Sequence, residues 1–135
     1  MTKSQIRDVV VARAKSRCEY CLSPLDFSSD DFAVEHIVPR SLLGSDDLNN
    51  LALSCQGCNN RKFIALSAID PATGVETRLF HPRLDIWFDH FIWSDDSTEL
   101  IGLTAVARAT IARLELNRAR VQNLRRVLVL AGKHL

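Results

Sequence analysis

Apolar residues recur at helical spacing near both ends of the chain. Close to the N-terminus, this spacing predicts a helix over residues 3–16, with one face formed by Ile6, Val9, Val10 and Ala14. Thr2 and Gln5 have the spacing of a capping box at its start. Toward the C-terminus the pattern predicts a helix that begins near Thr104 and a last helix whose apolar face is formed by Val121, Leu124, Leu128 and Ala131.

The stretch between these ends lacks a helical period at first. Two short apolar pieces, Leu25–Phe27 and residues 32–37, flank a Ser/Asp-rich turn, which predicts a two-stranded hairpin. Residues 38–54 are polar with a proline and a glycine and predict a loop, whereas residues 56–66 predict a helix. The pattern as a whole predicts an α+β fold.

Composition is that of an ordinary globular protein, with 135 residues, 47% hydrophobic and 24% charged. These values exclude a disordered or low-complexity chain. We expect a core over residues 1–70 and a mostly helical extension over residues 71–135 that packs on it as one structural unit. No apolar run is long enough to cross a membrane and the N-terminus lacks the apolar region of a signal peptide, so we expect a cytoplasmic protein without a membrane partner.

The formal net charge is only +1, but charge is distributed unevenly. The last 33 residues hold seven basic residues and one acidic residue. Arginines on these helices are compatible either with a solvated helix face or with a surface that binds the DNA backbone. The six arginines are Arg108, Arg113, Arg118, Arg120, Arg125 and Arg126.

All four cysteines occur in two C-x-x-C pairs, Cys18/Cys21 and Cys55/Cys58. Two such pairs in a reducing compartment are typical of a closed four-thiolate shell around a structural zinc. Unpaired thiols or two disulfides are the alternative. The 33 residues between Cys21 and Cys55 exceed the usual zinc-ribbon spacing, so the metal is expected to hold the two ends of an inserted unit together.

The insert and the residues after it carry three polar motifs in a fixed order. These are Glu35-His36-Ile37-Val38-Pro39, Asn49-Asn50-Leu51 and, after the last cysteine, Asn59-Asn60-Arg61-Lys62. Together with the cysteine pairs, they resemble the HNH endonucleases, whose core is a zinc-stapled ββα-metal unit. The resemblance covers about residues 18–62. It departs from the family pattern at Glu35, where Asp is usual, and at Asn59, where His is frequent.

The resemblance implies a role for each polar residue. His36 would be the general base and Asn50 would hold it in place, while Glu35 and Asn59 would ligate one catalytic magnesium or manganese ion. Phosphate contacts would come from Lys62, Arg61 and Arg40. Asn49 and Asn60 stand beside Asn50 and Asn59 as alternatives in these roles.

The residue types suit phosphodiester hydrolysis independently of the family. A neutral histidine takes a proton from water near pH 7, and a hard cation prefers oxygen ligands. Because neighbours on a strand point to opposite faces, Glu35 and His36 need a bend or a strand end to serve one site. We therefore predict metal-dependent hydrolysis of double-stranded DNA. The alternatives are a non-catalytic zinc-dependent module that binds nucleic acid and a protein-interaction zinc domain.

The second half of the chain also resembles the extension of a group of small bacterial HNH proteins. It carries His81 and His90 near Asp85 and Asp89, which are compatible with packing histidines or with a second metal site. Its aromatic residues between positions 80 and 93 are compatible with core packing or with base stacking. The oligomeric state has no signature in the sequence.

Overall fold

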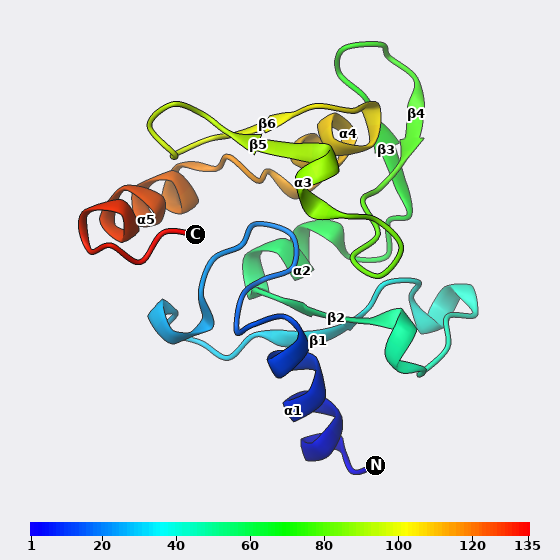
Figure 1. Ribbon diagram of the computed structural model, residues 1–135. Helices are drawn as coiled ribbons and strands as arrows, with labels where there is room; N and C mark the ends of the chain where they lie inside the picture. The colour runs from blue at the N-terminus through cyan, green and yellow to red at the C-terminus, as the bar shows by residue number, and fades with distance from the viewer. The chain divides into compact units, whose positions relative to one another are not determined.

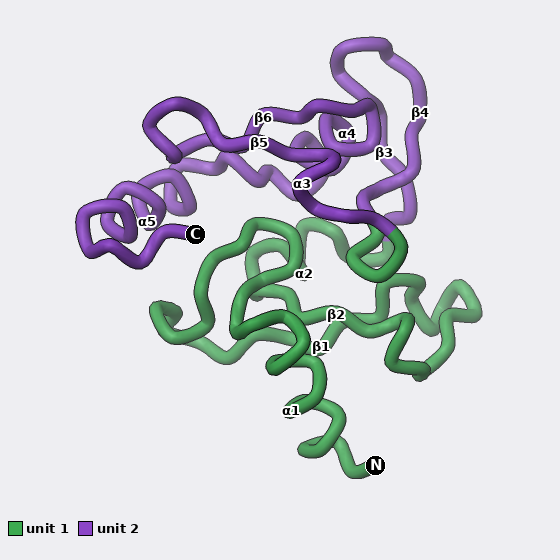
Figure 2. The backbone as a smooth tube through the Cα atoms, viewed as in Figure 1, with its two compact units in different colours: residues 1–64, 81–84 green, residues 65–80, 85–135 purple.

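The computed structural model describes residues 1–135 and shows a mixed α+β protein, as predicted. The chain forms two compact units (Figure 2). The first contains residues 1–64 and 81–84, and the second contains residues 65–80 and 85–135. The expected boundary after residue 70 therefore falls within the second unit. No helix has the length and apolar character that a membrane crossing requires.

Helix α1 (Lys3–Arg13) opens the first unit. The predicted capping box is present, because the Thr2 hydroxyl accepts from the Gln5 amide at 3.1 Å and the Gln5 side chain accepts from the Thr2 amide at 2.8 Å. The helix ends before the predicted residue 16, since Lys15 and Ser16 adopt positive φ angles of 54° and 57°. Its buried Val10 directs one face of α1 toward β2.

Strands β1 (Ala33–His36) and β2 (Leu51–Ser54) form an antiparallel hairpin with Glu35 opposite Ala52 and His36 opposite Leu51 (Figure 1). The predicted pairing of Leu25–Phe27 with residues 32–37 is wrong, because Leu25–Phe27 is a short 3-10 turn. The true partner comes from the stretch predicted as a loop. All four residues of β2 are buried, so it lacks the apolar–polar alternation that reveals a half-buried strand.

Helix α2 (Gln56–Lys62) follows β2 directly and packs against β1, which completes a ββα unit (Figure 1). Cys55 is its N-cap, and the Cys55 sulfur accepts from the Cys58 amide at 3.4 Å. The helix is shorter than the predicted 56–66. Phe63 has a φ of 50°, which ends the helical backbone there.

The second unit combines two hairpins with three helices, so the extension contains more strand than predicted. Its elements are β3 (Ser67–Ile69), β4 (Glu76–Arg78), α3 (Trp87–His90), β5 (Phe91–Trp93), β6 (Leu100–Gly102), α4 (Ala105–Leu114) and α5 (Ala119–Leu130). The two predicted C-terminal helices are confirmed as α4 and α5. Thr104 caps α4 by accepting from the Ala107 amide at 3.1 Å, and α4 packs against both hairpins.

The sequence left open the roles of the C-terminal arginines and of the aromatic residues between positions 80 and 93, and the second unit buries members of both groups. Arg125 is 2% exposed and donates to the carbonyls of Thr98 and Leu116 at 2.9 and 2.8 Å, so this arginine belongs to the core. Trp87 stacks on the buried Phe91 with ring centroids 4.9 Å apart. These contacts favour packing over base stacking for that aromatic pair.

Candidate functional site

The four cysteines of the first unit converge at one point. Cys18 and Cys21 lie on a turn closed by the Leu22 amide, which donates to the Cys18 carbonyl at 3.0 Å. Cys55 and Cys58 lie at the start of α2. All four sulfurs lie within 4.8 Å of one another, and the sulfurs of Cys21 and Cys55 are 3.7 Å apart. A tetrahedral shell with zinc–sulfur bonds of about 2.3 Å requires sulfurs about 3.8 Å apart, so the cluster is suited to a structural zinc.

The surroundings of the cluster also fit a cation. Cys18, Cys21 and Cys58 are buried. Burial raises the pKa of the Cys18 thiol well above its ordinary value, whereas hydrogen bonds from neighbouring cysteines, that of Cys18 first, lower the pKa of Cys21. Four enclosed thiols cannot all ionise without a positive charge among them. A zinc ion supplies that charge, so its binding is expected to be coupled to folding.

His36 is the last residue of β1 and has a partner that the sequence analysis missed. Its Nε2 atom lies 2.8 Å from Oδ1 of Asp46, and the same oxygen accepts from Nε of Arg40 at 2.9 Å. The hydrogen bond from His36, followed by that from Arg40, lowers the pKa of Asp46. Because a carboxylate only accepts, Nε2 carries the proton and Nδ1 of the neutral ring keeps a lone pair.

Asn50 secures the loop that follows His36. Its Oδ1 accepts from the Val38 amide at 2.9 Å, and its Nδ2 donates to the carbonyls of Val38 at 2.9 Å and Ser45 at 2.8 Å. Asn50 is buried, whereas the neighbouring Asn49 is exposed. The side chain therefore ties the end of β1 to the segment that carries Asp46.

Glu35 points to the other face of β1, into the interior. Its side chain is 4% exposed, accepts from the Tyr20 hydroxyl and lies 3.4 Å from Nζ of Lys62. Lys62 is 2% exposed and also donates to the Ile37 carbonyl at 2.9 Å. Burial raises the pKa of Glu35, and the charge of Lys62 opposes that rise. Lys62 thus lies in the core, whereas the sequence led us to expect a phosphate contact at the surface.

Comparison with known proteins identifies this part of the chain. The family model of the HNH endonucleases matches residues 18–63. Residues 18–63 are an HNH endonuclease domain. The match spans both cysteine pairs, β1, β2 and α2. No curated protein and no solved structure matches the chain.

Two further residues of the HNH domain were assigned roles from the sequence. The side chain of Asn59 is half-buried, has no hydrogen-bond partner within the protein and lies three residues before Lys62, on the same face of α2. Arg61 donates to the Gly57 carbonyl of its own helix at 3.1 Å. The amide oxygen of Asn59 and the carboxylate of Glu35 are oxygen donors of the kind that a hard cation prefers, and the Glu35 carboxylate is already bound by Tyr20 and Lys62.

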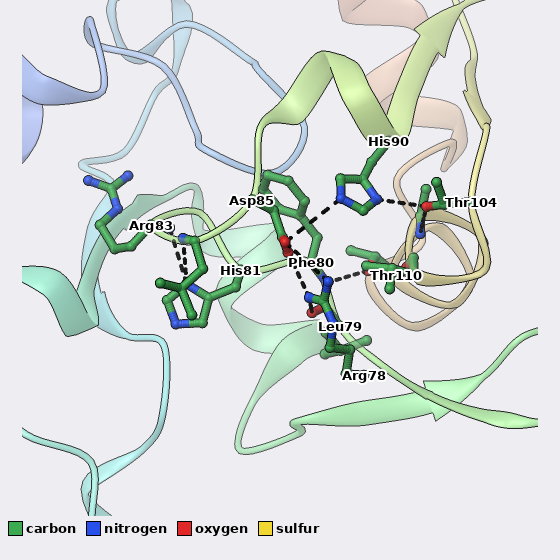
Figure 3. Close-up of polar contacts among 12 residues, drawn as sticks. Arg78, Leu79, Phe80, His81, Arg83, Asp85, His90, Thr104 and Thr110 are labelled. Carbon is green, nitrogen blue, oxygen red and sulfur yellow. Dashed lines mark hydrogen bonds and ion pairs between the residues drawn. The ribbon is translucent and has the colours of Figure 1, made fainter.

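Histidines outside the HNH domain are engaged in local structure. Nδ1 of His90 lies 2.7 Å from the Thr104 hydroxyl, and its Nε2 lies 3.8 Å from Oδ1 of Asp85. Figure 3 marks both contacts. Asp85 is itself held by both terminal nitrogens of Arg78, at 2.7 and 3.1 Å. Nδ1 of His81 accepts from the Arg83 amide at 3.1 Å. The four cysteines form the one group of three or more His, Cys, Asp or Glu side chains whose ligand atoms come together in the chain, so the contacts of His81 and His90 favour packing over a second metal site.

Proposed function

We propose that the protein is a metal-dependent endonuclease that hydrolyses phosphodiester bonds of double-stranded DNA, with His36 as general base. The observation that carries the proposal is the contact between His36 and Asp46 inside an HNH endonuclease domain, beside a cavity that both residues line. HNH endonucleases act on nucleic acid, which supports this substrate class. His36 is 22% exposed, so water reaches its ring.

The chain's own residues define the proton transfer. Asp46 accepts from Nε2 of His36, which leaves Nδ1 to take the proton from the attacking water. The oxygen of that water forms the new bond to phosphorus as the bond to the leaving oxygen breaks. Asn50 holds the backbone at Val38 and Ser45, so the histidine and its carboxylate partner keep their relative position during the reaction.

Glu35 and Asn59 are the residues that would hold the catalytic magnesium or manganese. When bound, such a cation polarises the phosphate and stabilises the charge that develops on the leaving oxygen. Glu35 is a carboxylate next to Lys62 at 3.4 Å, so it would exchange part of that contact for the cation. Asn59 contributes an uncommitted amide oxygen on α2. Few protein oxygens are available, and cation binding in the absence of DNA is therefore expected to be weak.

The test is plasmid nicking with millimolar-scale magnesium or manganese and with EDTA as the blank. We expect His36→Ala to lower turnover by about 100-fold or more while zinc content and melting stay unchanged. Asp46→Asn should lower turnover by less than His36→Ala does. Asp46→Glu, which keeps a carboxylate, should retain more activity than Asp46→Asn. His134→Ala, which alters a histidine on the C-terminal segment, is the matched control and should cut like the wild type.

The alternative hypothesis is a zinc-dependent module that binds nucleic acid without cutting it. Wild-type protein that binds DNA but nicks neither DNA nor RNA with any of these cations would establish that hypothesis. Full activity of His36→Ala would place the base elsewhere. Binding measured without added magnesium or manganese separates both outcomes from a failure to bind.

A further inference from the structure

A groove of about 400 Å³ opens beside His36 in the first unit. One wall comes from α1, with Lys3, Ile6 and Arg7, and the other comes from β1, β2 and the loop between them. The groove therefore joins the candidate base to a helix that lies outside the matched HNH region of residues 18–63. Neither the sequence motifs nor the family match assigns a function to that helix.

We propose that this groove binds the nucleic-acid backbone next to the scissile phosphate, with Lys3 and Arg7 of α1 as phosphate contacts. The inference rests on the proposed function, since it extends the site of His36 along the substrate strand. It assigns to α1 a binding role in addition to its packing against β2.

Charge in the groove favours a polyanion. Its lining includes the cations Lys3, Arg7 and Arg40 against a single carboxylate, Asp46. Asp46 is already engaged by His36 and by Arg40 at 2.8 and 2.9 Å, which neutralises Arg40 within the site. Of the other two cations, Lys3 has no partner, and NH2 of Arg7 lies 4.0 Å from the exposed carboxylate of Asp31, so Lys3 is the positive charge most available to a ligand and Arg7 shares its charge with Asp31. An anion in this groove therefore meets a local field that is positive although the whole chain has a net charge of only +1.

Helix α1 fixes the backbone positions of the two cations. The capping box at Thr2 fixes the start of α1, so Lys3 stands on its first turn. Arg7 is one turn further, about 6 Å along the helix axis. NH1 of Arg7 donates to the Phe32 carbonyl at 2.6 Å, just before β1, which ties the guanidinium to the strand that carries His36. Lys3 is exposed and its side chain has no partner within the protein.

The apolar part of the lining suits the same ligand. Ile6, Val34 and Leu51 add apolar surface to the same groove. A nucleic-acid strand presents sugar carbons between its phosphates, so it satisfies both kinds of surface. A free phosphate or a mononucleotide would use the cations alone and would leave the apolar part of the groove uncovered.

The experiment measures binding without cleavage. A fluorescein-labelled DNA duplex is titrated with the whole protein without added magnesium or manganese and without a chelator, so that the structural zinc is retained. Anisotropy is followed at salt concentrations between about 50 and 200 mM, where phosphate contacts dominate the salt dependence. Lys3→Gln should weaken binding several-fold and reduce the slope of log K against log salt by about 0.9, the value for one lost phosphate contact. Arg7→Gln should do the same, with melting measured because Arg7 also contacts Phe32. Lys15→Gln is the matched control, since Lys15 is exposed, has no side-chain partner and lies outside the groove.

The outcomes separate this inference from the proposed function. If the wild type cuts DNA and Lys3→Gln binds with the affinity and salt slope of the wild type, the groove proposal is overturned and the nuclease proposal stands. Equal losses in Lys3→Gln and Lys15→Gln would show a non-specific charge effect and would also overturn it. If Lys3→Gln alone is impaired but the wild type never cuts, the groove binds nucleic acid and the catalytic proposal fails. Competition by inorganic phosphate as strong as by an oligonucleotide would identify an anion site rather than a strand site and would overturn the groove proposal.

Discussion

Removal of the Lys62 ammonium tests the buried pair behind β1. In Lys62→Met the side chain keeps most of its length but loses its charge. Two groups lose their donor at once: the Ile37 carbonyl, 2.9 Å from Nζ, and the Glu35 carboxylate, 3.4 Å from it. Lys62 and Glu35 have side chains only 2% and 4% exposed, so water does not replace the donor.

The expected cost follows from that enclosure. Breaking a buried ion pair by removing one partner costs about 3–5 kcal/mol, because the remaining charge stays buried and uncompensated. For a unit of this size the melting temperature should fall by more than about 10 °C. Glu35→Gln/Lys62→Met removes both charges, and the amide oxygen introduced in place of the carboxylate is still able to accept from the Tyr20 hydroxyl. The double variant should therefore recover a large part of the lost stability.

The assay is far-UV circular dichroism during heating, with zinc content measured for each variant. Lys15→Gln, at an exposed lysine of the same unit, controls for loss of a positive charge. Wild-type melting of Lys62→Met would refute the reasoning, because it would mean that the ammonium reaches solvent. Lys62 would then return as a candidate phosphate contact, and a reduced salt slope of DNA binding in the same variant would support that role.

Two other predictions concern zinc and acid stability. We expect one zinc per chain by elemental analysis, and Cys18→Ser should lose the metal and melt far below the wild type, because the thiolates join both ends of the insert; full zinc content in that variant would contradict this. Asp70 is fully buried and paired with Arg108 at 2.9 and 3.0 Å, and the hydrogen bond from Arg108 lowers its pKa from 3.8 to about 2. Because the pKa of Asp70 is lower in the folded state than in the unfolded state, its ionised carboxylate stabilises the fold above the ordinary pKa. This stabilisation is lost as the pH falls from about 4 through 2. Urea unfolding followed by tryptophan fluorescence reports this unit, which holds both tryptophans, and Asp70→Asn should flatten the pH dependence in that range whereas the exposed control Asp95→Asn should not.

The sequence predicted those parts of the fold that have local causes. The capping box and the apolar face of α1 are formed by residues that are close in the sequence, and the N-cap Thr104 marks the start of α4 in the same way. Strand β2 had no such signal, because it is short and buried throughout. Its pairing with β1 closes a long loop rather than a tight turn, and Asn50 binds backbone groups of that loop at Val38 and Ser45. The hairpins of the second unit are three-residue strands that give too few positions for a period to appear.

The residues of the candidate site likewise include some that have a signal in the sequence and some that have none. The spacing of the cysteines predicted the zinc cluster, because metal geometry requires particular residues at particular intervals. The resemblance to HNH endonucleases pointed to His36 and Asn50, whose roles stay predictions. Asp46 was missed, since an acid in a polar loop is ordinary until the fold brings it to 2.8 Å from an imidazole. Arg40 was assigned to phosphate, and the structure pairs it with Asp46.

Alternation along β1 explains why two adjacent polar residues have such different surroundings. Glu35 faces the interior, where Tyr20 and Lys62 compensate its charge, and His36 faces the groove beside Asp46. A catalytic cation held by Glu35 and Asn59 would therefore sit on the α2 side of the strand, while the base acts from the other. The strand stops at His36, and Asn50 binds the backbone at Val38, two residues beyond it. Under the proposed mechanism, base and cation would have to reach the same phosphate around this end of the strand, so we expect the backbone at Val38 to matter as much as the identity of Glu35 or His36.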